Sequence, residues 1–176
     1  FRRSRGLGDV YKRQEEYFEV IRKKTASLIS TCCEAGAISV ESNQHRENMR
    51  KFGEKVGLAF QIKDDIFDYG SPNNIGKPTG IDIREQKLTL PLIYTMRNAP
   101  VKVQKELKRI IKNKNEEAKM IKRATQLVIE HGGISYAFDR MNALAEEARE
   151  LLKEYPDNES KQALLGLVDY TINREK

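Results

Sequence analysis

The chain has no tryptophan and few other aromatic residues, and this scarcity argues against a large aromatic core as its main source of stability. Aromatics make up 7% of the 176 residues, whereas charged residues make up 33%; such a composition is typical of helical proteins with a modest core. No run approaches the roughly 18 apolar residues that span a membrane, and no signal peptide is recognisable. We therefore expect no stable insertion into a membrane.

Cysteine is nearly absent as well, and the only two, Cys32 and Cys33, are neighbours. Adjacent cysteines rarely pair with each other and lack the spacing of zinc ligands. We expect both to be small buried apolar residues. The lack of any disulfide framework is typical of a reducing compartment, so the expected location is cytoplasmic.

The net charge of +6 is distributed unevenly along the chain. Residues 1–14 contain five basic side chains and one acidic one, a balance of +4, which leaves +2 for residues 15–176. Together with the scarcity of aromatics among the basic residues, this is poor evidence for a nucleic-acid surface. A basic helical protein that binds nucleic acid is the less favoured alternative, and we expect no nucleic-acid partner.

Residues 1–14 also lack the apolar periodicity that begins directly after them. Their last seven residues, Gly-Asp-Val-Tyr-Lys-Arg-Gln, resemble translated sequencing-adapter read-through at the ends of metagenomic reading frames. The hypothesis is a non-native leader over residues 1–14, with a native sequence that starts near Glu15 and is truncated upstream. A genuine basic arm is the alternative.

From Glu15 onward, apolar residues recur at three- and four-residue spacing, which predicts an all-α fold in a single domain over residues 15–176. The small residues of Cys32–Ala37 should let another helix approach closely. Pro91 should either kink its helix or mark a boundary. The expected helices cover residues 15–40, 44–69, 84–98, 101–112, 116–131, 134–153 and 161–173.

Three carboxylates lie within five residues near the end of the second predicted helix. At about 100° per residue, Asp64, Asp65 and Asp68 fall on one narrow face. Gln61 lies one turn earlier on that face. Aspartate is a poor helix former, like charges four residues apart repel, and a helix C-terminus disfavours anions. A cation should therefore lie against this face, and a hard divalent ion is the natural candidate.

A longer pattern surrounds these carboxylates. Phe-Gln-x-x-Asp-Asp-x-x-Asp over residues 60–68 is followed by Gly76-Lys77 and by Lys87-Leu-Thr-Leu-Pro91. The combination resembles the second aspartate-rich motif of the polyprenyl synthetase family, the trans-isoprenyl diphosphate synthases. The resemblance runs from about Tyr17 to the C-terminus, and the Lys-Thr-Ala and Cys-Cys-Glu-Ala-Gly-Ala segments are most similar to long-chain members. It implies an isoprenoid-synthase-type helical bundle, of which this chain is the C-terminal part only.

The resemblance also implies a reaction, the Mg²⁺-dependent condensation of an allylic diphosphate with isopentenyl diphosphate, head to tail, to a polyprenyl diphosphate. Asp64 would bind Mg²⁺ directly, while Asp65 and Asp68 would hold metal-bound water and orient lysines. Lys87 would contact diphosphate or form a salt bridge. The implied catalytic residues, which would also bind substrate, are Lys24, Thr25, Gln61 and Lys77.

The chain departs from the family pattern in one large respect. A full synthase carries a first aspartate-rich motif upstream of the Lys-Thr pair, and this motif is missing here. We expect the chain alone to be inactive in prenyl transfer, and the full-length parent to be an active homodimer. The alternative is a non-catalytic regulatory subunit of a heteromeric synthase. The intact aspartates, Gln61 and both motif lysines argue against it.

Overall fold

The computed structural model of the chain describes residues 7–40, 43–70 and 79–175. Within these ranges all regular elements are helices and none is a strand, so the all-α prediction is confirmed. The chain folds into two compact units. The first unit comprises Phe1–Tyr17 and Asp64–Phe138, and the second comprises Phe18–Lys63 and Asp139–Lys176.

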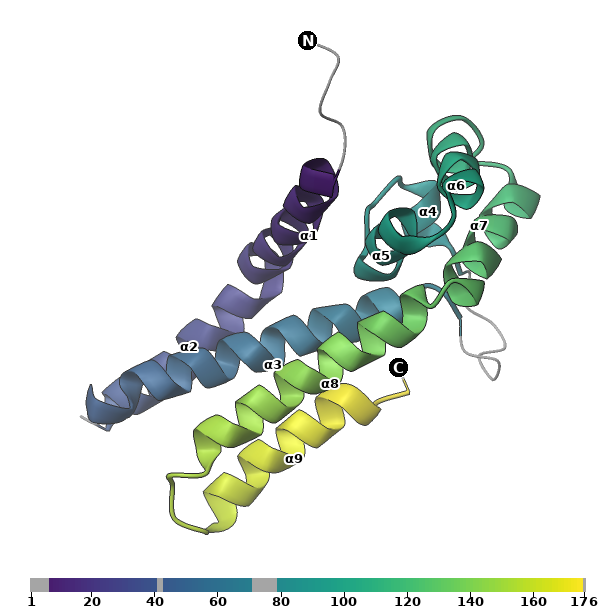
Figure 1. Ribbon diagram of the computed structural model, residues 1–176. Coiled ribbons are helices and arrows are strands. Elements are labelled where there is room, and N and C mark those ends of the chain that lie inside the picture. Colours follow the sequence, from purple (N-terminus) through teal and green to yellow (C-terminus); the bar gives the residue numbers. More distant parts are fainter. Residues whose placement is uncertain (1–6, 41–42, 71–78, 176) are drawn as a thin grey trace. The chain divides into compact units, whose positions relative to one another are not determined.

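The helices follow one another along the chain as labelled in Figure 1. Most are α-helices, η1 is a π-helix and η2 is a 3₁₀-helix. Their bounds are α1 (Leu7–Ile21), η1 (Arg22–Ala26), α2 (Ser27–Ser39), η2 (Asn43–His45), α3 (Arg46–Phe67), α4 (Ile81–Arg84), α5 (Leu90–Asn98), α6 (Val101–Asn113), α7 (Ala118–Glu130), α8 (Gly133–Leu152) and α9 (Glu159–Asn173).

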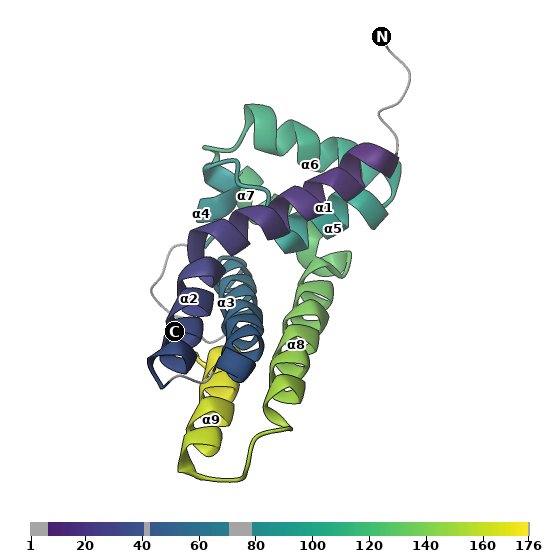
Figure 2. The same ribbon diagram turned by 90° about the vertical axis from the view of Figure 1, so that its left-hand side faces the viewer.

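The first unit is built around α5, α6 and α7, which Figures 1 and 2 show grouped together. Each of these helices turns a stripe of aliphatic residues to a shared core, and α6 does so at Leu107, Ile110 and Ile111. The three- and four-residue spacing of this stripe is the reason that the segment forms a helix here. Full burial of each such side chain stabilises the fold by about 1.5–3 kcal/mol.

The predicted helix over residues 84–98 is wrong in its first part. α4 ends at Arg84 and α5 begins only at Leu90. Between them Gln86 has a φ of 57°, which is outside the helical region. Pro91 lies in the first turn of α5, where a missing N–H leaves no helical hydrogen bond unmade and the fixed φ suits the helix. Of the two predicted roles of Pro91, the boundary is the correct one.

The second unit is formed by the end of α1, η1, α2, η2, most of α3, the larger part of α8, and α9. α8 and α9 lie side by side in both ribbon views (Figures 1 and 2). The core of this unit joins three helices, with members from α3, α8 and α9. Its buried apolar residues are Phe52, Val56, Ala145, Ala148, Leu152 and Val168.

Two glycines of α3 let the η1–α2 segment come unusually close. A Cβ atom on Gly57 would stand 2.5 Å from the Cα atom of Ala26, and one on Gly53 would stand 2.7 Å from the carbonyl oxygen of Ile29. Only glycine fits there without movement of a helix. The close approach therefore lies earlier in the chain than the predicted Cys32–Ala37 segment. Within the described ranges, no atom comes within 4 Å of a Cβ built on Gly36.

The two cysteines are less buried than predicted. Cys32 is exposed and Cys33 is half-buried, both as free thiols. α2 buries Ser30 and Ala37 instead, because these residues lie on the face that α3 approaches. The expectation of two buried cysteines is therefore wrong.

Among the described residues, no helix is both long enough and apolar enough to cross a membrane.

Candidate functional site

The predicted Lys24–Thr25 pair lies in η1, a single turn of π-helix between α1 and α2. A π-turn contains one residue more than an α-helical turn and is often found at functional sites. Lys24 is exposed on this turn, and Thr25 is half-buried. Lys23, on the same turn, forms an ion pair with Glu19 at 3.0 Å, so within the described part of the chain Lys24 is the cation of the turn that stays available. The turn therefore presents positive charge beside a partly shielded hydroxyl.

The structure brings Thr25 together with Gln61, another predicted site residue of the second unit. The Thr25 hydroxyl donates to Oε1 of Gln61 at 3.0 Å, across 36 residues of sequence. Gln61 is only 7% exposed. A buried amide needs hydrogen-bond partners, and this bond fixes the rotation of the amide. Thr25 is thus a positioning partner of Gln61.

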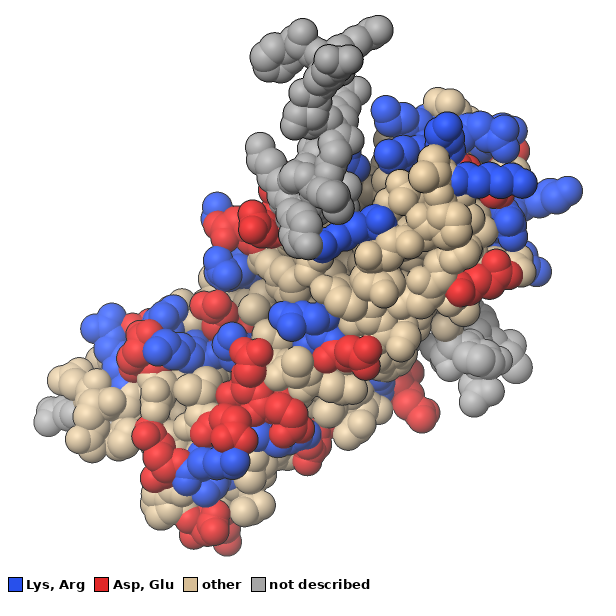
Figure 3. Space-filling model, viewed as in Figure 1, with Lys and Arg blue, Asp and Glu red and all other residues tan. Residues whose placement is uncertain are grey.

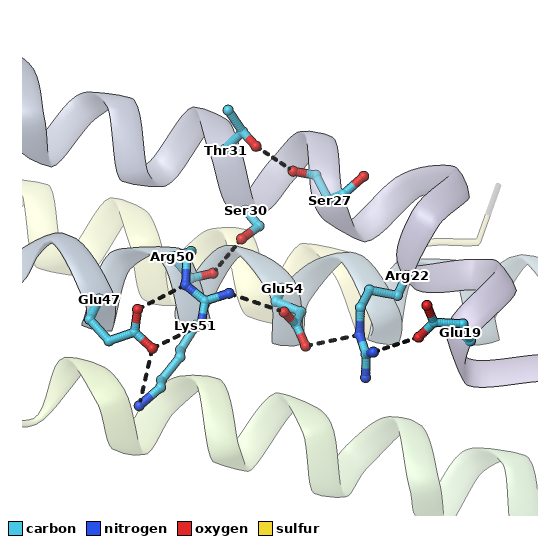
Figure 4. Close-up of polar contacts among 9 residues, drawn as sticks. All are labelled: Glu19, Arg22, Ser27, Ser30, Thr31, Glu47, Arg50, Lys51 and Glu54. Atoms are coloured by element: carbon cyan, nitrogen blue, oxygen red, sulfur yellow. Dashed lines mark hydrogen bonds and ion pairs between the residues drawn. The ribbon is translucent and has the colours of Figure 1, made fainter. Parts of the chain in front are cut away.

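One ion pair links the π-turn to α3, and a second links the turn to α1 (Figure 4). Nε of Arg22 lies 3.3 Å from a carboxylate oxygen of Glu54, and Nη1 lies 2.7 Å from Glu19. One turn further on, the Ser30 hydroxyl donates to the carbonyl oxygen of Arg50 at 2.8 Å. Exposed ion pairs of this kind contribute little individually. The Ser30 bond, which lies near the glycine contacts, is the better-shielded link between the two helices.

In the first unit, Asp65 has a partner that the sequence analysis missed. The phenol of Tyr17 donates to Oδ2 of Asp65 at 2.7 Å, and both residues are buried. Burial, and next the charge of Asp65, raise the pKa of the Tyr17 phenol well above its usual range, so the phenol stays a donor. The four-residue spacing of Tyr17 and Ile21, the buried residues of this stretch, is the signal that could have identified Tyr17.

Asp68 binds the backbone that follows the glycine-rich segment. Its two carboxylate oxygens accept the amide N–H groups of Ile81 and Asp82, both at 2.9 Å. Its carbonyl oxygen accepts from the N–H of Gly80 at 2.8 Å. Carboxylates stabilise helix N-termini in this way, here that of α4. Burial raises the pKa of Asp68, although the two amide hydrogen bonds oppose that shift.

The aspartates do not form a ready-made metal cage. In the part of the chain that the structure describes, no three His, Cys, Asp or Glu side chains are grouped so that they could hold a metal ion. Asp64 is half-buried, and Asp65 and Asp68 bind Tyr17 and backbone amides. Mg²⁺ often takes only one or two carboxylates and fills its other positions with water and phosphate oxygens. The oxygen donors present fit Mg²⁺ that is shared with a diphosphate.

Of the two remaining predicted lysines, the structure describes only Lys87. Lys77 lies outside the described residues. Lys87 is exposed, and its Nζ lies 2.5 Å from a carboxylate oxygen of Glu85 and 3.5 Å from one of Asp82. The hydrogen bond to Glu85 raises the pKa of Lys87. The salt bridge, one of two roles predicted for Lys87, is present, and a diphosphate contact stays a prediction.

Comparison with known proteins gives these residues a context. A family model described as polyprenyl synthetase matches residues 6–128 of the chain. The chain belongs to the polyprenyl synthetase family. This confirms the resemblance noted from the aspartate motif. The match begins within the predicted leader, and the boundary of that leader stays a prediction.

Several polyprenyl synthetases, some of them with solved structures, are similar to the chain over most of its length. Geranylfarnesyl diphosphate synthase of Aeropyrum pernix is 35% identical over 165 residues, which is 92% of this chain and 51% of that protein. The solved decaprenyl diphosphate synthase of Rhodobacter capsulatus has a TM-score of 0.85 at 33% identity, over 93% of this chain and 51% of that one. The helical fold predicted for the family is thereby confirmed.

A third relative was solved with ligands bound. The polyprenyl synthase of Caulobacter crescentus, complexed with calcium and isoprenyl diphosphate, has a TM-score of 0.83 at 33% identity, over 93% of this chain and 50% of that one. The chain thus spans about half the length of the polyprenyl synthetases that it matches. Relatives named for products of different length match with similar identity, so identity does not select a product length.

Proposed function

We propose that the whole protein to which this chain belongs is a Mg²⁺-dependent prenyltransferase. It condenses an allylic diphosphate with isopentenyl diphosphate, head to tail, and forms a polyprenyl diphosphate. The observation that carries the proposal is the hydrogen bond from Thr25 to Gln61, because it joins two separate parts of the family pattern within one folded unit.

The first requirement of this reaction is to bind a diphosphate and to ease its departure. Lys24 supplies a cation on the π-turn, and Thr25 beside it, whose one hydroxyl hydrogen goes to Gln61, is proposed to line the diphosphate site. Lys77 is proposed as a second diphosphate lysine, with Lys87 as a further contact. Bound Mg²⁺ would neutralise charge that develops on the leaving diphosphate. Asp64 would hold the ion, while Asp65 and Asp68 would hold its water ligands and orient lysines.

The second requirement is to protect the allylic cation until the double bond of isopentenyl diphosphate attacks it. Gln61 is suited to a place beside this cation because its amide is neutral and polar. A neutral amide is a weak nucleophile toward the cation, and the dipole of the amide can stabilise the cation. The bond from Thr25 holds the amide in a fixed orientation, so little reorganisation is needed when the cation forms.

The assembly and location of the protein are part of the same proposal. We expect the whole protein to be a cytoplasmic homodimer, as the family pattern implies. The two thiols, which form no disulfide, are compatible with a reducing compartment. A non-catalytic subunit of a heteromeric synthase is the alternative, and it is disfavoured because Gln61 and the motif aspartates are all present.

Transfer of label from isopentenyl diphosphate to polyprenyl product tests the proposal in the whole protein. Removal of Mg²⁺ with EDTA should abolish the transfer, and added Mg²⁺ should restore it. Asp64→Asn should lower kcat by on the order of 10²–10³-fold, since it removes charge that acts on the transition state. Glu150→Gln, at an exposed acid of α8, is the control and should leave kcat unchanged. Activity that survives both EDTA and Asp64→Asn would refute the proposal.

A further inference from the structure

Helices α6 and α7 carry a concentration of basic residues that the net charge of the chain conceals. Residues 101–123 contain nine lysines and arginines against three glutamates, a net charge of +6. The balance of residues 15–176 as a whole is +2, so the rest of that range carries −4. The near-neutral average therefore hides one strongly positive segment.

Most of this positive charge has no ion-pair partner within the part of the chain that the structure describes. Arg123 lies 3.0 Å from a carboxylate oxygen of Glu106, and Lys114 lies 3.0 Å from Glu117. The other seven side chains are exposed, and none forms an ion pair with any residue in the described ranges. These seven, called the cationic face below, are Lys102, Lys105, Lys108, Arg109, Lys112, Lys119 and Lys122. Figure 3 shows basic side chains gathered over α6 and α7.

The fold of the first unit holds these charges on one side of α6. Lys102, Lys105, Lys108, Arg109 and Lys112 fall within an arc of about 120° at the helical period. The opposite side of α6 is buried in the core shared with α5 and α7. The helix can neither roll nor turn its apolar side outward without unfolding that core. The charges therefore form a fixed surface field.

We propose that the cationic face docks the protein onto a membrane surface rich in anionic lipids. Lysine makes up six of its seven members, and a lysine ammonium is a compact, hydrated charge suited to a diffuse negative potential. Val101, at the start of α6 beside Lys102, is 64% exposed and offers an apolar contact at the level of the headgroups. Docking is peripheral, because the apolar side of α6 is already buried.

Nucleic acid is the other polyanion that such a surface could meet, and the face is poorly equipped for it. Residues 101–130 contain no aromatic residue on which a base could stack. Arg109 is the only arginine of the cationic face, so bidentate contacts to phosphates or bases are scarce. The choice of a membrane also rests on the proposed function: a polyprenyl diphosphate has a long apolar chain, and it partitions into lipid.

Co-sedimentation of the 176-residue chain with vesicles tests the docking directly. One set contains phosphatidylcholine alone, and the other contains about one third phosphatidylglycerol. A triple variant, Lys105→Gln, Arg109→Gln and Lys112→Gln, removes three charges from the cationic face. The matched control, Lys23→Gln, Lys51→Gln and Lys153→Gln, removes three exposed charges from the second unit.

The chain should sediment with the anionic vesicles, and about 0.3 M NaCl should release it. The face variant should bind at least about tenfold more weakly, and the control variant should bind as the original chain does. The proposal would be overturned by equal binding to neutral vesicles, by equal loss in both variants, or by no binding at all. Tighter binding to duplex DNA than to anionic vesicles would overturn it as well. Prenyl transfer on soluble substrates by the whole protein should be unchanged in the face variant, which separates this proposal from the proposed function.

Discussion

Tyr17 donates its phenol hydrogen to Asp65 at 2.7 Å, and the two residues are 48 positions apart in the sequence. Both are buried, at 7% and 8% exposure. The bond orients the central aspartate of the motif independently of any ligand. We therefore propose Tyr17 as a positioning residue for Asp65.

Replacement of Tyr17 by Phe tests this role. The variant keeps the ring and leaves a buried carboxylate without its phenol donor, so the free energy of unfolding should fall by about 1.5–3 kcal/mol. Urea denaturation measures this change. The matched control is Tyr69→Phe, which removes an equally buried phenol at 2.8 Å from the Thr89 hydroxyl. A neutral pair should contribute only about 0.5–1.5 kcal/mol. Equal losses in both variants would contradict a special role for Tyr17.

Substitution of Gly57 by Ala should separate α3 from the π-turn. The new Cβ would lie 2.5 Å from the Cα atom of Ala26, a backbone atom that can move only with its helix. We expect a loss of about 1–3 kcal/mol of stability, as is usual for overpacking. The shift should also weaken the bond between Thr25 and Gln61 and lower kcat in the whole protein.

Gly36→Ala is the control for that experiment. Gly36 lies inside α2, and a Cβ built on it meets no described atom within 4 Å. Alanine is the better helix former there, so this variant should gain about 0.5–1 kcal/mol. The two glycine substitutions should thus have opposite signs in thermal unfolding. A neutral or stabilising Gly57→Ala would show that the close approach is unimportant.

The stability of the chain should depend on pH through Asp68. Burial raises the pKa of this carboxyl above its ordinary value of 3.8 in the folded state. The folded state then holds the proton more tightly than the unfolded state does. This contribution to stability is complete below the unfolded pKa and is lost as the pH rises through the folded pKa.

Comparison with Asp68→Asn isolates the effect. The free energy of unfolding of the original chain, measured in metal-free buffer, should fall relative to that of the variant as the pH rises from about 3 to about 7. The change of this free-energy difference with pH should be confined to the pH range between the unfolded-state and the folded-state pKa of Asp68. A difference that stays constant with pH, or that rises, would contradict the raised pKa.

The two cysteines should react at different rates. Cys32 is exposed, whereas half-burial, and next the neighbouring thiol, raise the pKa of Cys33. Because the thiolate is the reactive form, Cys33 should label more slowly than Cys32 at neutral pH and should need more alkaline conditions. Labelling with a chromogenic disulfide should give a fast and a slow phase, and Cys32→Ser should remove the fast one. Loss of the slow phase instead would reverse the assignment.

Local signals in the sequence predicted much of the fold. Periodic apolar residues predicted a helix over residues 101–112, and α6 covers Val101–Asn113. They failed where no local pattern exists. The π-turn at Arg22–Ala26 was not predicted, because the apolar spacing of this stretch indicates one continuous helix. The break before α5 was missed because Pro91 alone does not distinguish a kink from a start.

The sequence predicted residues for the candidate site and did not predict their contacts. The motif residues Gln61 and Asp64 follow from spacing, whereas the Tyr17–Asp65 bond links distant parts of the sequence that only the fold brings together. The hydrogen bonds that the Asp68 carboxylate accepts from the backbone N–H groups of Ile81 and Asp82 were missed for the same reason. The charge of α6 was missed because a sum over residues 15–176 averages it against acidic helices.

The glycine pair of α3 has a consequence for the register of the helices in the second unit. Gly53 and Gly57 are one turn apart and receive the backbone at Ile29 and at Ala26, respectively. A slide of one helix along the other by one turn, about 5.4 Å, would put a bulky side chain against one of these contacts. The slid arrangement would also carry the Thr25 hydroxyl away from its amide partner. The axial alignment of these two site residues is therefore set by the absence of two side chains.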